Sequence, residues 1–592
     1  MGRNLPQDAA HAATVRLTGN GKRVLAVNEP QDKQIPYLST LPLVHSHLTM
    51  YSDIPQVNQL TALLLAHGIK DVVVCPGSRN ATIVHNLNEV CDRIQLHAVT
   101  DERSAAFVAL GMTLATQEPV AVCVTSGSAL LNCIPAVAEA YYRHLPLLVI
   151  SADRPAAWIG QMDGQTLPQA GAIQPYCPTC SISVPHSDTD RWCNNRRINE
   201  ALLSLQRGDG HPAHINVAIE EPMFSFTTTT LPEERCIHRF SAPVSHPLPD
   251  AVVQQIAQAK LPMLVIGHYE RGDIRKEVTD LISQGQMLVL PEIISDVEGN
   301  HLTEAFDSLA GTNEEVMPDV VVQIGGNFVH KRFKQALRQS TCQVIRIGLD
   351  EELTDTFCHL SCWIDTPVRP ALEQLADCLP HDNEGVGLAT NRLRREWESI
   401  RPQIHPSGEC SSDAPTMTSI LMAVQKQLAS ISQSFTLHLA NSSTVRAAGK
   451  VFESGQFPIY CNRGTNGIEG SLSTAVGYAL KMWGLSIAVI GDLSFFYDAN
   501  ALWNTGLPSN LRILLFNNGH GSIFDHLTGL ENSPARDAYI AAGHQHYDAE
   551  GLARTFHLGY TSIRSEGEAK ERIAQWLAVH DEAQILEVFV KD

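Results

Sequence analysis

Short apolar runs of strand length alternate with amphipathic helical patterns along most of the chain. After Glu102, for example, apolar residues recur at Ala105, Val108, Ala109 and Met112, a spacing of three and four positions that indicates a helix. The apolar runs of this part lie at residues 72–75, 95–99, 120–124 and 147–150. Strands alternating with helices predict a parallel sheet covered by helices.

The same alternation returns twice further along the chain. Apolar runs lie at residues 263–266, 287–290, 320–324 and 344–347, and again at 436–439, 458–461, 486–490, 513–516 and 585–590. A chain of 592 residues is too long for one hydrophobic core. We therefore predict an α/β fold of three doubly wound parallel-sheet domains, at residues 51–230, 245–400 and 412–592. Residues 1–50 lack sustained periodicity and are predicted to form a disordered or dispensable extension.

Composition narrows the class of protein. The formal charge is −20 and no dense Lys/Arg tract occurs, which argues against nucleic acid or an anionic membrane as a partner. No apolar run reaches the length of a membrane span. The fourteen cysteines are scattered, and several fall inside apolar runs, as in a reduced, cytoplasmic protein.

Two predicted strands end in polar pairs. The run 486–490 leads into Gly491-Asp492, and the run 513–516 leads into Asn517-Asn518. Open parallel sheets bind ligands at the carboxyl ends of their strands. The 26 positions between Asp492 and Asn518 leave room for a crossover helix, expected at 499–507. A carboxylate, an amide and nearby backbone carbonyls suit Mg²⁺ whose remaining ligands come from a diphosphate.

This pairing resembles the thiamine-diphosphate signature of decarboxylases and carboligases. That cofactor needs a carboxylic acid beside N1′ of its aminopyrimidine ring, and Glu102 follows the second predicted strand at a suitable place. Taken alone, Glu102 could equally be an acidic residue that stabilises the first turn of a helix.

Further motifs, in order over all three domains, sharpen the resemblance. From about Tyr51 to Asp592 the chain resembles the 2-succinyl-5-enolpyruvyl-6-hydroxy-3-cyclohexene-1-carboxylate synthases of menaquinone biosynthesis, a family of thiamine-diphosphate-dependent enzymes. The motifs are Pro76-Gly77-Ser78-Arg79, Asp101-Glu102-Arg103, Thr125-Ser126-Gly127-Ser128, Ala152-Asp153-Arg154-Pro155, Lys331-Arg332, Asn441-Ser442-Ser443-Thr444-Val445-Arg446, Asn462-Arg463-Gly464, Gly467-Ile468, Gly491-Asp492-Leu493-Ser494, Asn517-Asn518 and Gly521-Ser522-Ile523-Phe524. Leu493 replaces the glycine of most thiamine enzymes and favours this family.

The resemblance implies domains of thiamine-diphosphate-binding type and a role for each matching residue. Glu102 is the expected catalytic acid that activates the cofactor. The side chains of Asp492 and Asn518, with the His520 carbonyl, are the expected ligands of Mg²⁺ or Mn²⁺. The other expected cofactor contacts are Ser128, Ser442, Ile468, Leu493 and Ser494. The expected substrate contacts are Ser78, Arg79, Arg154, Gln165, Lys331, Arg332, Arg446, Arg463, Ile523, Phe524 and Leu527.

The implied reaction is the decarboxylation of 2-oxoglutarate and the addition of its succinyl semialdehyde unit to isochorismate. Together the two substrates carry four carboxylates, which a cluster of cations would bind. The resemblance also implies a homodimer or homotetramer, with the cofactor between the first domain of one subunit and the third of another.

Three alternatives remain open at this point. An acetolactate-synthase-like carboligase, or another 2-oxoacid decarboxylase, would share the cofactor residues but lack the cations at Arg79, Lys331, Arg332 and Arg446. A nicotinamide-dependent oxidoreductase is disfavoured, because no GxGxxG motif opens a βαβ unit. A catalytically silent binding protein would not need Glu102, Asp492 and Asn518 together.

Overall fold

A computed structural model describes residues 14–17, 23–26 and 49–590, apart from gaps at 207–209, 241–245, 271, 310–311, 350–351, 405–413, 505 and 544–546. The chain divides into two compact units, Met1–His47 and Leu48–Asp592. In the first, β1 (Thr14–Leu17) and β2 (Arg23–Ala26) form an antiparallel pair. The rest of the predicted extension at 1–50 lies almost entirely outside the described residues. No helix in the described ranges is both long and apolar enough to cross a membrane.

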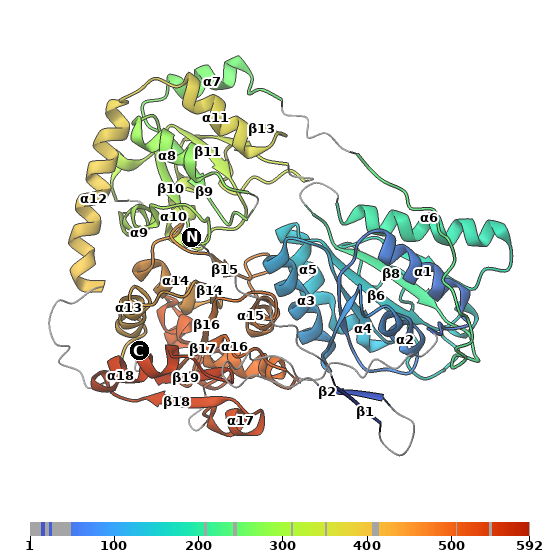
Figure 1. Cartoon of the computed structure of the whole chain (residues 1–592). Helices are drawn as coiled ribbons and strands as arrows, with labels where there is room; N and C mark the ends of the chain where they lie inside the picture. Colours follow the sequence, from blue (N-terminus) through green and yellow to red (C-terminus); the bar gives the residue numbers. More distant parts are fainter. Residues whose placement is uncertain are drawn as a thin grey trace, which may run out of the picture. The chain divides into compact units, whose positions relative to one another are not determined.

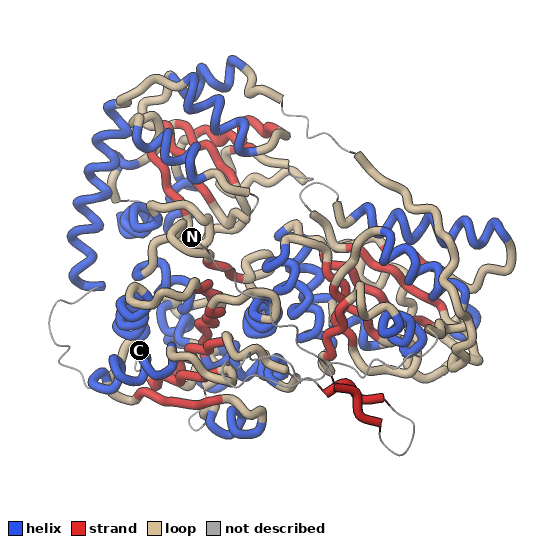
Figure 2. Tube along the Cα trace, viewed as in Figure 1, coloured by secondary structure: helices blue, strands red, loops and turns tan. Residues whose placement is uncertain are grey.

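The larger unit contains three sheets, and every strand pair in them is parallel. Figure 2 shows the strands of each sheet flanked by helices on both faces. Strands such as β5 (Val120–Val124) are buried along their whole length, as expected of a sheet covered on both sides. The predicted α/β fold of three parallel sheets is thus confirmed.

The first sheet has the strand order β4-β3-β5-β6-β8-β7. Its strands are β3 (Asp71–Val74), β4 (Gln95–Ala98), β5, β6 (Leu147–Asp153), β7 (Thr179–Ile182) and β8 (Ala213–Ala218). The helices around it are α1 (Pro55–Ala66), α2 (Ala81–Glu89), α3 (Glu102–Thr116), α4 (Ser128–Asn132), α5 (Ile134–Arg143) and α6 (Asp188–Ser204). The helix α3 begins at the predicted place because the Asp101 carboxylate accepts hydrogen bonds from the N–H groups of Arg103 and Ser104.

The central sheet has the order β10-β9-β11-β12-β13. The strand that follows β9 in the chain pairs with one edge of β9, and β11 pairs with the other edge, so the order of strands across the sheet switches direction between β9 and β11. Its strands are β9 (Pro262–Ile266), β10 (Leu288–Pro291), β11 (Val320–Ile324), β12 (Gln343–Ile347) and β13 (Leu360–Ile364). Its helices are α7 (Asp250–Ala257), α8 (Arg275–Ser283), α9 (Asn300–Leu309), α10 (Lys331–Gln339), α11 (Val368–Cys378) and α12 (Glu384–Ile404).

The third sheet has the order β15-β14-β16-β17-β19-β18, which repeats the order of the first sheet strand for strand. Its strands are β14 (Phe435–Leu439), β15 (Ile459–Cys461), β16 (Leu485–Gly491), β17 (Leu511–Asn517), β18 (Gly559–Ile563) and β19 (Gln584–Phe589). Its helices are α13 (Met417–Leu428), α14 (Ser443–Val451), α15 (Ser471–Ala479), α16 (Asp492–Tyr497), α17 (Glu550–Thr555) and α18 (Glu566–Leu577).

The connection between β16 and β17 differs from the expected helix at 499–507. The helix α16 begins directly at Asp492, and only Ala499–Leu502 follows, as a 3-10 turn. Asp498 lies between the helix and the turn, and its buried carboxylate accepts hydrogen bonds from the N–H and the hydroxyl of Ser473, each at 2.8 Å. These two bonds fix the chain between the helix and the turn, so one continuous crossover helix does not form.

The first and third sheets share a core through two helices in contact, α3 and α15 (Figure 1). A Cβ atom built on Gly477 of α15 would lie 2.0 Å from the carbonyl oxygen of Val108. Likewise, a Cβ atom on Gly111 of α3 would lie 2.0 Å from the carbonyl oxygen of Thr474. The two backbones can approach this closely only because both positions are glycine.

Replacing Gly477 by alanine should therefore destabilise the fold. The helices must separate, and overpacking of this kind costs about 1–3 kcal/mol, more than the roughly 1 kcal/mol that alanine adds to helix propensity. Chemical denaturation measures the change. The matched control is Gly567→Ala on α18, where an added Cβ meets nothing within 4 Å. We expect that variant to be neutral or slightly more stable; equal behaviour of the two variants would contradict the packing argument.

Candidate functional site

The carboxyl ends of β16 and β17 meet through the carboxylate of Asp492, which is only 3% exposed. Its Oδ1 accepts a hydrogen bond from Leu493 N (2.7 Å), and its Oδ2 accepts one from Gly519 N (2.8 Å). Gly519 has φ +79°, the left-handed conformation that turns its N–H towards Asp492. Asn518 is half-buried beside this turn, and its Oδ1 accepts a hydrogen bond from His520 N at 3.3 Å.

The ring of His520 lies within this turn. Its Nε2 pairs with the carboxylate of Asp525 at 2.6 Å, and its Nδ1 lies 3.2 Å from the Asn518 carbonyl oxygen. Ser494, at the start of α16, donates a hydrogen bond from its hydroxyl to the carbonyl of Ile468. The turn after β17 and the strand-end Asp492 are thus joined to the segment that carries Ile468.

A cavity of about 380 Å³ brings together some of the predicted residues of the central and third domains, whereas its lining in the described part of the chain does not include Asp492, Asn518 or His520. The predicted residues that line it are Lys331, Ser442, Arg446, Arg463, Ile468, Ile523, Phe524 and Leu527. Sequence reasoning missed four lining residues: Val329, Lys334, Asn441 and Asn466. Lys334 could have been found, because it follows Lys331 by three positions on one helix and so shares its face.

The charged side chains that line this cavity are all positive. Among the residues that the structure describes, its lining contains four cations and no carboxylate. Burial lowers the pKa of Arg446, and the nearby charge of Arg463 lowers it further. Burial likewise lowers the pKa of Lys334, followed by the charges of Arg463 and Arg338. Bound carboxylates would relieve this repulsion, so the cavity is suited to anions.

The wall beside these cations has features of an anion site. Ser442 has φ +76° and ψ −129°, a conformation that costs a residue with a side chain about 1–3 kcal/mol and that clusters at functional sites. It precedes α14, whose N-terminus has no side-chain cap. Uncapped N–H groups at the start of a helix bind phosphate groups well. The guanidinium of Arg463 donates to Asn441 Oδ1 and to the Phe328 carbonyl, while its buried Nε has no hydrogen-bond partner in the described part of the chain.

The first domain places its predicted residues at the carboxyl ends of its own strands. Glu102 is half-buried at the start of α3, and its Oε2 accepts a hydrogen bond from Asn132 Nδ2 at 3.1 Å. Beside it, Arg103 donates to the Tyr497 carbonyl at 2.6 Å and stacks on that ring at 4.3 Å. The start of α3 therefore lies against the end of α16 in the same chain.

The other predicted residues of the first domain do not line the cation-rich cavity of their own chain. Ser78 and Ser128 are exposed, and Gln165 is exposed with φ +54°. Arg79 is buried and donates to the Ile219 carbonyl and to Glu221, while Arg154 pairs with Asp163 at 3.0 Å. Arg332 is likewise exposed and outside the lining, although it neighbours Lys331.

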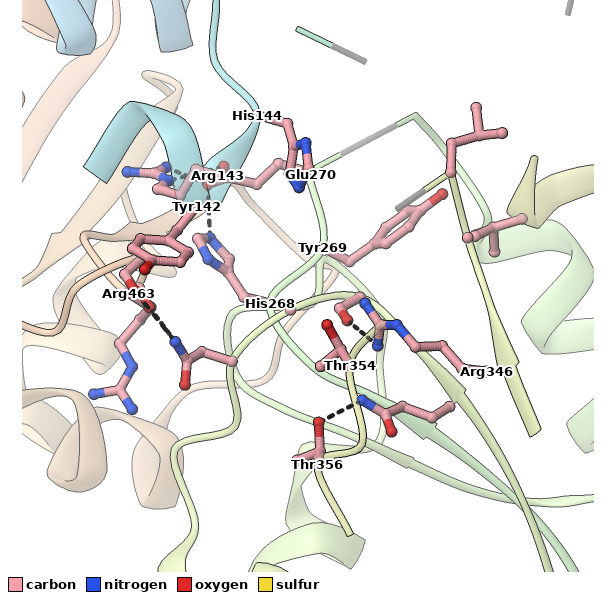
Figure 3. A pocket seen from close by; sticks show the side chains of 18 of the residues that line it. Tyr142, Arg143, His144, His268, Tyr269, Glu270, Arg346, Thr354, Thr356 and Arg463 are labelled. Atoms are coloured by element: carbon pink, nitrogen blue, oxygen red, sulfur yellow. Dashed lines mark hydrogen bonds and ion pairs between the residues drawn. The ribbon is translucent and has the colours of Figure 1, made fainter. Parts of the chain in front are cut away.

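A second cavity, of about 520 Å³, lies at the carboxyl ends of β9, β11 and β12 in the central sheet (Figure 3). Sequence analysis did not predict it. Arg463 and Lys334 line both cavities. At its edge, Arg143 from α5 pairs with Glu270 of the central domain at 2.6 Å and donates to Asn462 of the third domain at 2.9 Å. All three domains thus meet at one buried guanidinium.

The chain is similar to known proteins over most of its length. Residues 57–174 match the family described as "Thiamine pyrophosphate enzyme, N-terminal TPP binding domain". Three relatives are each named "2-succinyl-5-enolpyruvyl-6-hydroxy-3-cyclohexene-1-carboxylate synthase". That of Bacteroides fragilis is 40% identical over 533 residues, which cover 88% of this chain and 93% of the relative. That of Bacteroides thetaiotaomicron is 41% identical over 532 residues, with the same coverage. That of Phocaeicola vulgatus is 39% identical over 552 residues, covering 91% and 96%.

These identities extend over all three sheets, and the matched family domain contains Glu102. The resemblance inferred from the motifs is therefore confirmed. The chain belongs to the family of thiamine-diphosphate-dependent 2-succinyl-5-enolpyruvyl-6-hydroxy-3-cyclohexene-1-carboxylate synthases.

Proposed function

We propose that the chain decarboxylates 2-oxoglutarate and joins the resulting succinyl semialdehyde unit to isochorismate. The observation that carries this proposal is the cavity lined by Lys331, Lys334, Arg446 and Arg463, with no carboxylate from the described ranges in its lining. Two dicarboxylate substrates need such a surplus of positive charge. The apolar side chains of Ile523 and Phe524 line the same cavity and would exclude water from the reacting carbons.

The residues present fit thiamine diphosphate and its metal. Asp492, Asn518 and the His520 carbonyl would hold Mg²⁺ or Mn²⁺ as a set of oxygen ligands. The uncapped start of α14 at Ser442 would receive the diphosphate. When bound, the cofactor supplies an electron sink for the loss of CO₂. Glu102 would hold a proton against the N1′ atom of the aminopyrimidine ring.

Arg446→Ala should weaken substrate binding and leave cofactor binding intact. Loss of a charge-assisted hydrogen bond to a carboxylate costs about 1.5–3 kcal/mol, or roughly ten- to a hundredfold in KM. The assay combines protein, thiamine diphosphate, Mg²⁺, 2-oxoglutarate and isochorismate, and follows CO₂ release and isochorismate consumption. Arg394→Ala, at an exposed position on α12, is the control. Turnover of pyruvate in preference to 2-oxoglutarate would instead support an acetolactate-synthase-like enzyme.

The cofactor site is proposed to span two subunits of a homodimer or of a homotetramer built from such dimers. Large apolar side chains near both half-sites are exposed in a single chain. Leu131, next to the Asn132 that holds Glu102, is 41% exposed, and Ile468 and Leu527 at the cavity are each 40% exposed. Exposed apolar surface of this kind indicates an interface.

Mixing two inactive variants tests this arrangement. Glu102→Gln damages one half-site and Asp492→Asn the other. If the site spans two subunits, each mixed dimer contains one intact site and one doubly damaged site. Unfolding and refolding an equimolar mixture should therefore restore about a quarter of the wild-type activity, because half of the random dimers are mixed. No recovery from mixed dimers, verified by differently tagged chains, would place both halves of the site in one chain.

A further inference from the structure

A buried cluster of one histidine and two glutamates adjoins the cation-rich cavity, because Val329 and Lys331, on either side of His330 in the chain, line that cavity. His330 Nδ1 pairs with Glu292 Oε2 at 2.8 Å, and His330 Nε2 pairs with Glu304 Oε1 at 3.0 Å. All three side chains are at most 8% exposed. Glu292 follows β10 and Glu304 lies on α9, so the ring joins two elements of the central domain.

The cluster holds the start of α10 in place. Glu292 Oε1 accepts hydrogen bonds from the N–H groups of Val329 (2.8 Å) and His330 (3.2 Å). His330 is the residue before α10, and that helix presents Lys331 and Lys334 to the cavity. A further carboxylate, Asp307 on α9, accepts a hydrogen bond from Phe333 N at 2.7 Å.

The same cluster is in contact with the helix that carries Arg446. A Cβ atom at Gly449 of α14 would lie 2.8 Å from Glu304 Oε1, so the carboxylate of Glu304 occupies the space that a side chain would take. Arg446 lies on α14 three positions earlier. The His330 cluster therefore links the two helices from which three of the four cavity cations come.

Charge explains why a histidine suits this position. A neutral ring has one N–H, whereas an imidazolium has an N–H on each nitrogen and so a proton towards each carboxylate. Burial lowers the pKa of His330, but the charges of Glu292 and Glu304 outweigh this effect and raise the pKa well above 6.5. Other charged groups near the cluster are Asp307, Arg332, Lys334 and Arg446. The two carboxylates in contact with the ring therefore favour the imidazolium over the neutral form.

We propose that His330 is a positioning residue for substrate binding. As an imidazolium between Glu292 and Glu304, it holds Lys331 and Lys334 in place beside Arg446 in the cavity. This role rests on the proposed function of the cavity and assigns no contact between His330 and the substrates. It predicts that loss of the histidine affects substrate affinity through the lysines.

A double-mutant cycle on the holoenzyme tests the proposal. We expect His330→Gln to raise the KM of at least one substrate about tenfold, with kcat and thiamine diphosphate binding little changed. Replacing both lysines, as Lys331→Ala/Lys334→Ala, should have at least as large an effect. Adding His330→Gln to that variant should raise KM no further, because a residue that acts only through the two lysines has no effect once they are absent. Additive effects, or an unchanged KM for His330→Gln, would overturn the positioning role.

Two controls separate this role from general damage. His301→Gln removes a histidine on α9 that pairs with Glu453 at 3.3 Å and lies outside the cavity lining, so its KM values should match wild type. Should His330→Gln fail to fold, Glu304→Gln keeps the pair of His330 with Glu292 and should still raise KM. An unchanged KM for Glu304→Gln would overturn the proposal.

Nitrogen NMR of the wild-type protein gives a readout independent of activity. At pH 8 the ring of His330 should show two protonated nitrogens, identified by comparison with the variants. His214 is the internal reference: its ring is buried between Ser151 and Thr179, and burial lowers its pKa to about 3, so it stays neutral. A neutral His330 ring would overturn the proposal. Absence of wild-type turnover with 2-oxoglutarate and isochorismate would instead overturn the proposed function.

Discussion

Replacing Glu102 by glutamine should remove most of the turnover and leave thiamine diphosphate bound. Glutamine keeps the size of the side chain, and it can still accept the hydrogen bond of Asn132. It cannot exchange a proton with the cofactor, and loss of such general acid–base help costs about 10²- to 10⁴-fold in rate. Initial rates at saturating substrates measure the loss, and titration with thiamine diphosphate measures its binding.

The neighbouring carboxylate supplies a matched control. Asp101 caps α3 through two backbone N–H groups, and asparagine caps a helix as well as aspartate does. Asp101→Asn also removes one negative charge from the same turn, so it should retain turnover within a few-fold. If both variants lost activity equally, the charge near the start of α3 would matter, and Glu102 would have no separate chemical role.

Sequence patterns found the parts of the site that lie at strand ends. Asp492 and Asn518 stand immediately after buried apolar runs, and in a parallel sheet such positions share one edge. The pairing of β16 with β17 places the ends of these two strands side by side, and the Asp492 carboxylate accepts a hydrogen bond from Gly519 N in the turn after β17. The strand β8 was missed because it contains His214 and Asn216, two polar residues that the interior satisfies through hydrogen bonds with Ser151. Such compensation cannot be read from a local pattern.

The partners and the location of each predicted cation could be learned only from the structure. Arg79 and Arg446 are both arginines of the family motifs, and sequence alone treats them alike. In the fold, Arg79 is held by the Ile219 carbonyl and by Glu221, whereas Arg446 lines the cavity. No sequence pattern pointed to His330, because its partners Glu292 and Glu304 lie 38 and 26 positions away in the sequence. Contacts over such separations depend on how β10, α9 and α10 pack.

Arg143→Met should be among the most destabilising single changes in the protein. The side chain of Arg143 is 1% exposed, and it pairs with Glu270 and lies 3.6 Å from Glu139, which is fully buried. Removing the guanidinium takes a positive charge away from two buried carboxylates, of which Glu270 still faces His268 at 2.9 Å. Breaking a buried ion pair in this way costs about 3–5 kcal/mol. The free energy of unfolding from chemical denaturation, or the midpoint of thermal unfolding, measures the loss.

Two comparisons isolate the cause. Arg196→Met removes an exposed ion pair with Glu200 and should cost less than about 1 kcal/mol. The double variant Arg143→Met/Glu270→Gln removes a stranded charge as well as its partner, so it should regain part of the stability that Arg143→Met alone loses. If the double variant were the less stable of the two, lost packing of the long Arg143 side chain would be the main cause.

The pH dependence of this deficit follows from Glu270. Burial raises its pKa, but the charges of Arg143 and then His268 outweigh burial and lower the pKa from 4.5 to about 2. A carboxyl group with a depressed pKa stabilises the folded state above pH 4.5, and that contribution is lost as the pH falls towards 2. Arg143→Met lacks most of this contribution at neutral pH. The difference in unfolding free energy between wild type and variant should therefore become smaller below about pH 4.5. A difference that stayed constant down to pH 3 would show that the charge of Glu270 is not the source of the difference.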